Sequence, residues 1–132
     1  IVEKLSPRVF ETVKSDAKLL AQGFMKSELG QKAYNSTWYK NEYDFKFAMK
    51  INGKASIIDG QIDLVFKDEK TGKFVVVDFK SDSAINPNDH ISQLALYKKA
   101  TAALCNVDES KVETYLFYLR FGVTVNLGEY LL

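Results

Sequence analysis

The stretch Val75–Asp82, with the sequence VVVDFKSD, decides the fold because it joins an apolar strand to charged residues at the strand's end. The run before Asp78 is apolar at every position, which is typical of a strand covered on both faces. Successive side chains of a strand point to opposite faces, so Asp78 and Lys80 share one face and Phe79 takes the other. We therefore expect an internal strand that presents a carboxylate and an ammonium group side by side.

The sequence before this strand predicts an antiparallel meander. Apolar and polar residues alternate from Tyr43 to Ile51, and Asn52-Gly53 is a strong signal for a two-residue hairpin turn. A longer polar loop separates the second strand from the third. The expected strands and turns are, in order, 42–51, Asn52-Gly53, 56–66, 67–72 and 73–80.

Helical spacing of apolar residues predicts helices before and after the meander, with a proline near the start of the first. A helix between strands 73–80 and 112–119 should make these strands parallel, through a right-handed connection. The remaining expected elements are helices 7–24, 27–35 and 90–105 and strands 112–119 and 123–127. We therefore expect one α/β domain over residues 1–132, with a mixed sheet, N-terminal helices in 1–36 and a core in 42–127.

Composition limits the classes of function. The chain has 132 residues, enough for one core, and its 18 basic and 17 acidic residues give a net charge of +1. Nucleic-acid binding would therefore need a local basic patch or another part of a longer protein. The single cysteine, Cys105, excludes an internal disulfide and a cysteine-rich zinc site. The lone cysteine fits a reducing compartment, so we expect a cytoplasmic protein. No apolar run approaches the roughly 20 residues of a membrane span, so we expect no membrane partner.

A second acidic residue gives the Asp78–Lys80 pair a possible chemistry. Asp63 lies in the apolar second strand, and a turn near residue 70 places it opposite or diagonal to Asp78, within about 5 to 8 Å. Two carboxylates about 5 Å apart repel by roughly 3 kcal/mol at an effective dielectric constant near 20. Bound Mg²⁺ or Mn²⁺ would remove this repulsion, and Lys80 could hold a phosphate oxygen or orient an attacking water. The structural alternative is an ordinary ion pair, worth at most about 1 kcal/mol.

Three segments together resemble the nuclease domain of the RecB family within the PD-(D/E)xK superfamily: GQIDLVF at 60–66, VVVDFKSD at 75–82 and QLALY at 93–97. The resemblance implies a restriction-endonuclease-like core, in which helices flank a central twisted sheet. It further implies that Asp63, Asp78 and the backbone carbonyl of Phe79 bind the metal and that Lys80 is catalytic. Gln93 and Tyr97 would line the side of the site that faces DNA.

Residues 18–127 also resemble the nuclease domain of AddA-type helicase–nuclease subunits, in which a strand begins with a glutamate, here Glu42. This implies a Mg²⁺-dependent DNA exonuclease for DNA end processing and recombinational repair. Its substrate would be single-stranded DNA delivered by a helicase domain, which lies outside this chain and uses ATP. Glu42 would pair with a basic residue near the site or simply begin an exposed strand.

One feature of the family is missing from this sequence. RecB-family nucleases carry a histidine on a helix upstream of the first strand, and no histidine precedes Asp63 here. The chain starts at Ile1 rather than at methionine, so we expect a longer parent protein that holds this ligand. The alternative is a non-catalytic DNA-binding or structural module with a nuclease fold. His90 is either a further ligand or a surface or capping residue, and Asp82 either belongs to the motif or makes a turn.

Overall fold

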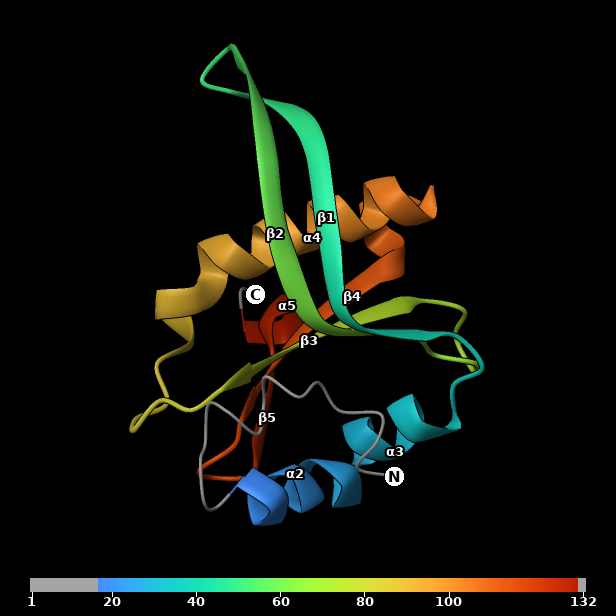
Figure 1. Cartoon of the computed structure of the whole chain (residues 1–132), viewed down its shortest axis with the longest axis vertical. Coiled ribbons are helices and arrows are strands. Elements are labelled where there is room, and N and C mark those ends of the chain that lie inside the picture. Colours follow the sequence, from blue (N-terminus) through green and yellow to red (C-terminus); the bar gives the residue numbers. More distant parts are fainter. Residues whose placement is uncertain (1–16, 131–132) are drawn as a thin grey trace.

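The computed structural model of the chain describes residues 17–130. A mixed five-stranded sheet is covered by helices α2 and α3 on one face and by α4 on the other (Figure 1). The elements are α2 (Ala17–Lys26), α3 (Glu28–Asn35), β1 (Tyr39–Ile51), β2 (Lys54–Lys67), β3 (Phe74–Lys80), η3 (Pro87–His90), α4 (Ile91–Cys105), η4 (Glu109–Lys111), β4 (Val112–Tyr118), β5 (Val123–Asn126) and α5 (Leu127–Tyr130). This arrangement confirms the predicted α/β class.

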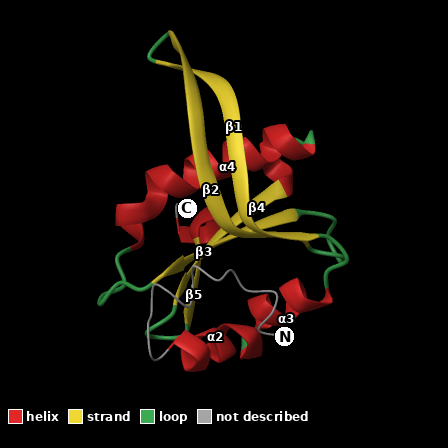
Figure 2. Ribbon diagram, viewed as in Figure 1, coloured by secondary structure: helices red, strands yellow, loops and turns green. Residues whose placement is uncertain are grey.

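The strand order in the sheet is β1-β2-β3-β4-β5. Strands β3 and β4 are parallel, and the other neighbouring pairs are antiparallel. The parallel pairing confirms the predicted crossover through the helix between these two strands (Figure 2). The right-handedness of this crossover connection stays a prediction. Among the described residues, no helix has both the length and the apolar character that a bilayer span requires.

The ends of several elements differ from the prediction. Strand β1 begins three residues before Glu42, because Tyr39–Asn41 pair with the end of β2. Strand β5 stops at Asn126, where the predicted strand continued to Leu127. The Asn126 side chain accepts a hydrogen bond from the Gly128 amide at 3.0 Å, which favours the start of the short helix α5. Residues 7–16 of the first predicted helix lie outside the described residues.

The hairpin turn between β1 and β2 follows the prediction. Asn52 and Gly53 have φ angles of 52° and 77°, as expected for a turn in which both central residues are left-handed. The distal half of this hairpin extends well beyond the other strands (Figure 1). The two strands pair from Tyr39 opposite Phe66 to Ile51 opposite Lys54, and the register leaves out only Glu42 and Asp63 between these ends.

The core lies on both faces of strand β3, whose residues 75–79 are all buried. Phe79 belongs to the cluster under α2 and α3, where its ring meets Phe24 edge-on at 4.8 Å. Val76 belongs to the cluster under α4, with Leu94 and Leu116. Because strand residues alternate, Asp78 and Lys80 lie on the same face as Val76. The sheet therefore presents both charged side chains toward α4.

Candidate active site

The two predicted carboxylates lie at the point where β2 and β3 separate. Leu64 opposite Val77 is the last paired position before this point, and Asp63 and Asp78 follow one residue further along each strand. Both side chains are on buried residues, with 4% of Asp63 and 2% of Asp78 exposed. The register therefore brings the two aspartates together as the spacing around residue 70 predicted.

The carboxylate of Asp63 bonds to the backbone of β3. Its Oδ2 accepts a hydrogen bond from the Phe79 amide at 2.9 Å, so that amide points toward β2. The next residue faces the other way, since the Lys80 carbonyl accepts from the Leu119 amide at 2.9 Å, on the β4 side. The N–H and C=O of one strand residue point to the same side of the strand. The Phe79 carbonyl is therefore directed toward the same opening as the Asp63 carboxylate.

Lys80 is held in place by contacts to β3 and α4. Its Nζ lies 2.7 Å from Oδ2 of Asp78 and donates a hydrogen bond to Oε1 of Gln93 at 2.9 Å. Nε2 of Gln93 donates in turn to the hydroxyl of Tyr97 at 2.9 Å. Gln93 and Tyr97 are four residues apart and share one face of α4. These contacts fix the ammonium group beside the Asp78 carboxylate and join Lys80, Gln93 and Tyr97 in one network.

Glu42 also lies at this end of the sheet. The pairs Asn41–Leu64 and Tyr43–Ile62 flank it, so Glu42 is the residue across from Asp63. Its φ angle of 49° is uncommon for a residue other than glycine, and it marks a local change of direction in β1. The structure thus places this predicted residue next to the site.

Two further contacts hold the loop that follows β3. Nε2 of His90 lies 2.8 Å from Oδ2 of Asp82, and the His90 side chain is only 15% exposed. His90 is the N-cap residue of α4, although its side chain makes no capping hydrogen bond there. Nε of Arg120 donates to the Ser81 carbonyl at 2.7 Å. Arg120 could not be identified from the sequence, because its partner is a backbone atom 39 residues away and no spacing signals such a contact.

The donor set at the opening fits a magnesium-type cation. Mg²⁺ is usually bound through one or two carboxylates and keeps several of its waters, which matches Asp63, Asp78 and the Phe79 carbonyl. Oδ2 of Asp78 is buried and accepts no hydrogen bond, although Nζ of Lys80 lies 2.7 Å away as an ion-pair partner. Such an oxygen is suited to a cation. No cluster of three or more His, Cys, Asp or Glu side chains that could hold a metal occurs in the described part of the chain.

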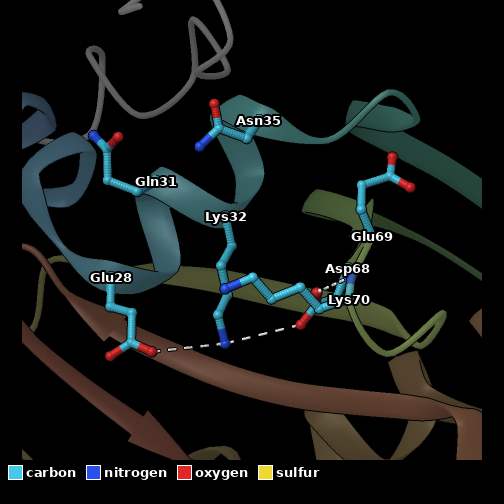
Figure 3. A pocket seen from close by; sticks show the side chains of 7 residues that line it. All are labelled: Glu28, Gln31, Lys32, Asn35, Asp68, Glu69 and Lys70. Atoms are coloured by element: carbon cyan, nitrogen blue, oxygen red, sulfur yellow. Dashed lines mark hydrogen bonds and ion pairs between the residues drawn. The ribbon is translucent and has the colours of Figure 1, made fainter.

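A separate hollow of about 300 Å³ lies between α3 and the β2–β3 turn (Figure 3). Three of its charged side chains form ion pairs: Nζ of Lys32 lies 3.8 Å from a carboxylate oxygen of Glu28 and 3.8 Å from one of Asp68. The Lys70 amide donates to Oδ1 of the buried Asp68 at 2.9 Å. The β2–β3 turn is at the opposite end of β3 from Asp78. These contacts explain how α3 is attached to the turn, and we assign the hollow no chemistry.

Comparison with known proteins gives three results. The family model described as PD-(D/E)XK nuclease superfamily matches residues 2–128. An ATP-dependent helicase/nuclease subunit of Anoxybacillus flavithermus (strain DSM 21510 / WK1) is 28% identical over 102 residues, which are 71% of this chain and 8% of that protein. The chain therefore corresponds to a small part of this relative's length. The crystal structure of SSO0001 aligns with a TM-score of 0.47 and 15% sequence identity, over 88% of this chain and 53% of that one.

Proposed function

The chain belongs to the PD-(D/E)XK nuclease superfamily, and from this premise we propose that it hydrolyses phosphodiester bonds of DNA with Mg²⁺ or Mn²⁺. One observation carries the proposal: Asp63 and Asp78 meet where β2 and β3 separate, with Lys80 2.7 Å from Asp78. Two buried carboxylates are costly when adjacent, and a cation offsets that cost. The side-chain types and their placement therefore fit metal-assisted hydrolysis.

The cation site would use three oxygen donors of this chain. The carboxylates of Asp63 and Asp78 and the carbonyl of Phe79 would hold Mg²⁺ or Mn²⁺. When bound, the cation supplies positive charge for a phosphate oxygen and makes a water molecule more acidic. The bond from the Phe79 amide keeps the Asp63 carboxylate oriented toward the opening.

Lys80 would act on the reacting groups directly. Its ammonium group would hold a phosphate oxygen or orient the water that attacks phosphorus in line with the departing oxygen. Gln93 would position Lys80 through the 2.9 Å bond to Nζ, and Tyr97 would position Gln93. The burial of Asp78 lowers the local dielectric constant and so strengthens these charge interactions.

In the cell, we propose that the chain is the exonuclease module of a longer helicase–nuclease. The match to 8% of an ATP-dependent helicase/nuclease subunit supports this placement. The helicase part would use ATP and deliver single-stranded DNA to the module in the cytoplasm, during DNA end processing and recombinational repair. Glu42 would lie at the DNA-facing edge, across from Asp63.

A non-catalytic DNA-binding module is the second candidate. It is favoured by the position of Lys80, whose ammonium group already contacts the Asp78 oxygen that a cation would need. In that case the Asp78–Lys80 pair is a partly buried structural ion pair, and removing one partner chiefly reduces stability.

End-labelled oligonucleotides incubated with Mg²⁺, Mn²⁺ or EDTA distinguish the two candidates. We expect cleavage only with a divalent cation, and a loss of about 10²- to 10⁴-fold in Asp78→Asn. The matched control is Glu109→Gln, which removes one negative charge from η4, far along the chain from the site. Cleavage that persists in Asp78→Asn would refute the assigned site. DNA binding without cleavage under either cation would establish the non-catalytic module.

A further inference from the structure

The distal part of the β1–β2 hairpin, residues 46–58, has an unusual charge. This segment, called here the hairpin arm, contains Lys46, Lys50 and Lys54 and no acidic residue. The net charge of the arm is therefore +3 while that of the whole chain is +1, so the rest of the chain carries −2. The arm also extends beyond the other strands of the sheet (Figure 1). A local basic patch thus exists on a chain that is otherwise slightly acidic.

The three lysines are available to a partner. All three are exposed, and no ion pair among the described residues involves any of them. Lys46 and Lys50 lie on one face of the hairpin, two side-chain positions apart. Between them on the same face lies Ile57, opposite Ala48, with 71% of Ile57 exposed. Asp59 lies opposite Lys46 on this face, while Lys54, opposite Ile51, lies on the other face of the hairpin. The arm therefore carries lysines on both faces, with a small apolar patch between Lys46 and Lys50.

The arm is fixed relative to the candidate active site. Phe45, the residue just before the arm, is 4% exposed and packs against Tyr97 with the ring centroids 5.7 Å apart. Gly60, opposite Phe45, leaves room for that ring, since a Cβ at Gly60 would lie 2.8 Å from it. Tyr97 is the residue that bonds to Gln93, and Asp63 is part of the same strand β2. The direction of the arm is therefore coupled to the residues of the site.

We infer that the hairpin arm binds the phosphate backbone of a single DNA strand that runs outward from the active site. The inference rests on the proposed function, because only a DNA substrate would place such a strand there. Lysines are point charges that suit phosphate, and each contact releases a counterion from the strand. The arm has a net charge of +3 on a chain whose remainder carries −2, so charge complementarity favours a polyanion at this surface.

The spacing of the three lysines sets the length of DNA strand that is needed to reach each of them from the active site. Lys46 is opposite Asp59, Lys50 is opposite Ala55, and Lys54 lies on β2 itself. At about 3.3 Å per strand residue, the three lie roughly 13, 26 and 30 Å from Asp63 along the strand. A stacked DNA strand advances about 3.4 Å per nucleotide, so these positions correspond to about four, eight and nine nucleotides.

The alternative role of these lysines is protection of the sheet edge. Strand β1 is an edge strand, and lysines on edge strands prevent pairing with other chains. That role predicts no dependence of DNA affinity on the arm beyond the effect of net charge. DNA affinity compared between variants of equal charge therefore separates the two roles.

The test uses fluorescence anisotropy of labelled oligodeoxythymidine of 3 and 12 nucleotides, in EDTA so that no cleavage occurs. The hairpin variant combines Lys46→Gln, Lys50→Gln and Lys54→Gln. The charge-matched control variant combines Lys26→Gln, Lys70→Gln and Lys111→Gln, which lie on α2, the β2–β3 turn and η4 and are all exposed.

For the 12-mer, the salt slope of log affinity should fall by about 2 in the hairpin variant relative to the control variant. The affinity ratio of the two variants should then change by roughly 20-fold between 50 and 200 mM salt. For the 3-mer, which does not reach the lysines, the two variants should bind equally. Ile57→Glu adds a negative charge to the same face and should weaken 12-mer binding in the same direction, should the triple variant fail to fold.

Equal affinity and equal salt slope of the two triple variants for the 12-mer would overturn the inference. A loss of equal size with the 3-mer would overturn it too, because the lysines would then act at the site itself rather than along an outgoing strand. Neither result bears on cleavage. Conversely, a wild-type protein that binds the 12-mer through the arm but never cleaves it would refute the proposed function and leave the binding surface standing.

Discussion

Replacement of Gly60 by alanine should destabilise the protein, because Gly60 lies directly opposite Phe45 in the β1–β2 hairpin. A Cβ at this position would lie 2.8 Å from Cζ and 3.0 Å from Cε2 of the Phe45 ring. Contacts this short cannot persist, so the ring must move. The ring packs against Tyr97 at 5.7 Å and Phe47 at 6.0 Å, and its movement would disturb both contacts.

The size of the effect follows from two opposing contributions. Adding a methyl group to a packed core costs about 1–3 kcal/mol when the neighbours cannot relax freely. The lower entropy of the unfolded alanine chain offsets about 0.4–1 kcal/mol of this cost. We therefore expect Gly60→Ala to lower the free energy of unfolding by about 1–2 kcal/mol. Gly23→Ala is the matched control: Gly23 is exposed in α2 with nothing within 4 Å of the added Cβ. It should stabilise by about 0.5–1 kcal/mol.

The assay is equilibrium unfolding in guanidinium chloride with linear extrapolation to water. A second variant, Phe45→Leu, removes the ring atoms that the new methyl group would meet. In that background Gly60→Ala should cost almost nothing, which corresponds to a coupling free energy of about 1–2 kcal/mol between the two positions. Equal costs of Gly60→Ala in the Phe45 and Leu backgrounds would refute the steric reasoning.

Three other predictions concern binding, titration and a buried charge. Mg²⁺ at 100 times its Kd should raise the free energy of unfolding by about 2.7 kcal/mol, and this increase should be absent in Asp78→Asn. Hydrogen bonds from the Thr37 side chain and backbone hold the pKa of the Glu69 carboxyl below its usual value. The stabilisation from the ionised carboxylate is therefore complete above the usual pKa, and it is lost as the pH falls through the lowered pKa. NMR titration of Thr37→Val should show the Glu69 pKa moving back up, and an unmoved pKa would contradict the assignment. Asp68→Ala should destabilise by about 1–3 kcal/mol in thermal or chemical unfolding, since it leaves the Lys70 amide without its acceptor, whereas Asp68→Asn should cost less.

The parts of the site that follow strand geometry could be predicted from the sequence. The facing positions of Asp63 and Asp78 depend only on an antiparallel pair and the position of its turn, and both are encoded locally. The shared face of Gln93 and Tyr97 depends only on helical periodicity. The family resemblance implied only that both residues line the DNA-facing side of the site. The structure adds that Gln93 accepts a 2.9 Å hydrogen bond from Lys80 and donates one of 2.9 Å to Tyr97.

Other features depend on partners far away in the sequence. The first three residues of β1 become a strand because β2 pairs with them, although their own alternation does not require it. The left-handed conformation of Glu42 occurs where the hairpin turns toward α4, and no residue preference signals it. Arg120 reaches the Ser81 carbonyl only because β3 and β4 end side by side. Local rules cannot predict contacts that the sheet creates after it has assembled.

The position of the candidate site follows from how β2 is divided between two packing environments. Its C-terminal part pairs with β3 in the sheet, while its N-terminal part belongs to the hairpin, whose base packs against Tyr97 on α4. One strand cannot continue along both the sheet and the hairpin, so the pairing of β2 with β3 ends at Leu64. The backbone of Phe79 therefore has no backbone partner on β2. The Asp63 carboxylate accepts the hydrogen bond of the Phe79 amide in place of a β2 carbonyl. The Phe79 carbonyl points into the same opening. A single break in strand pairing thus brings together the oxygen donors of the proposed cation site, and a variant that restored pairing beyond Leu64 should remove the site without changing any of its side chains.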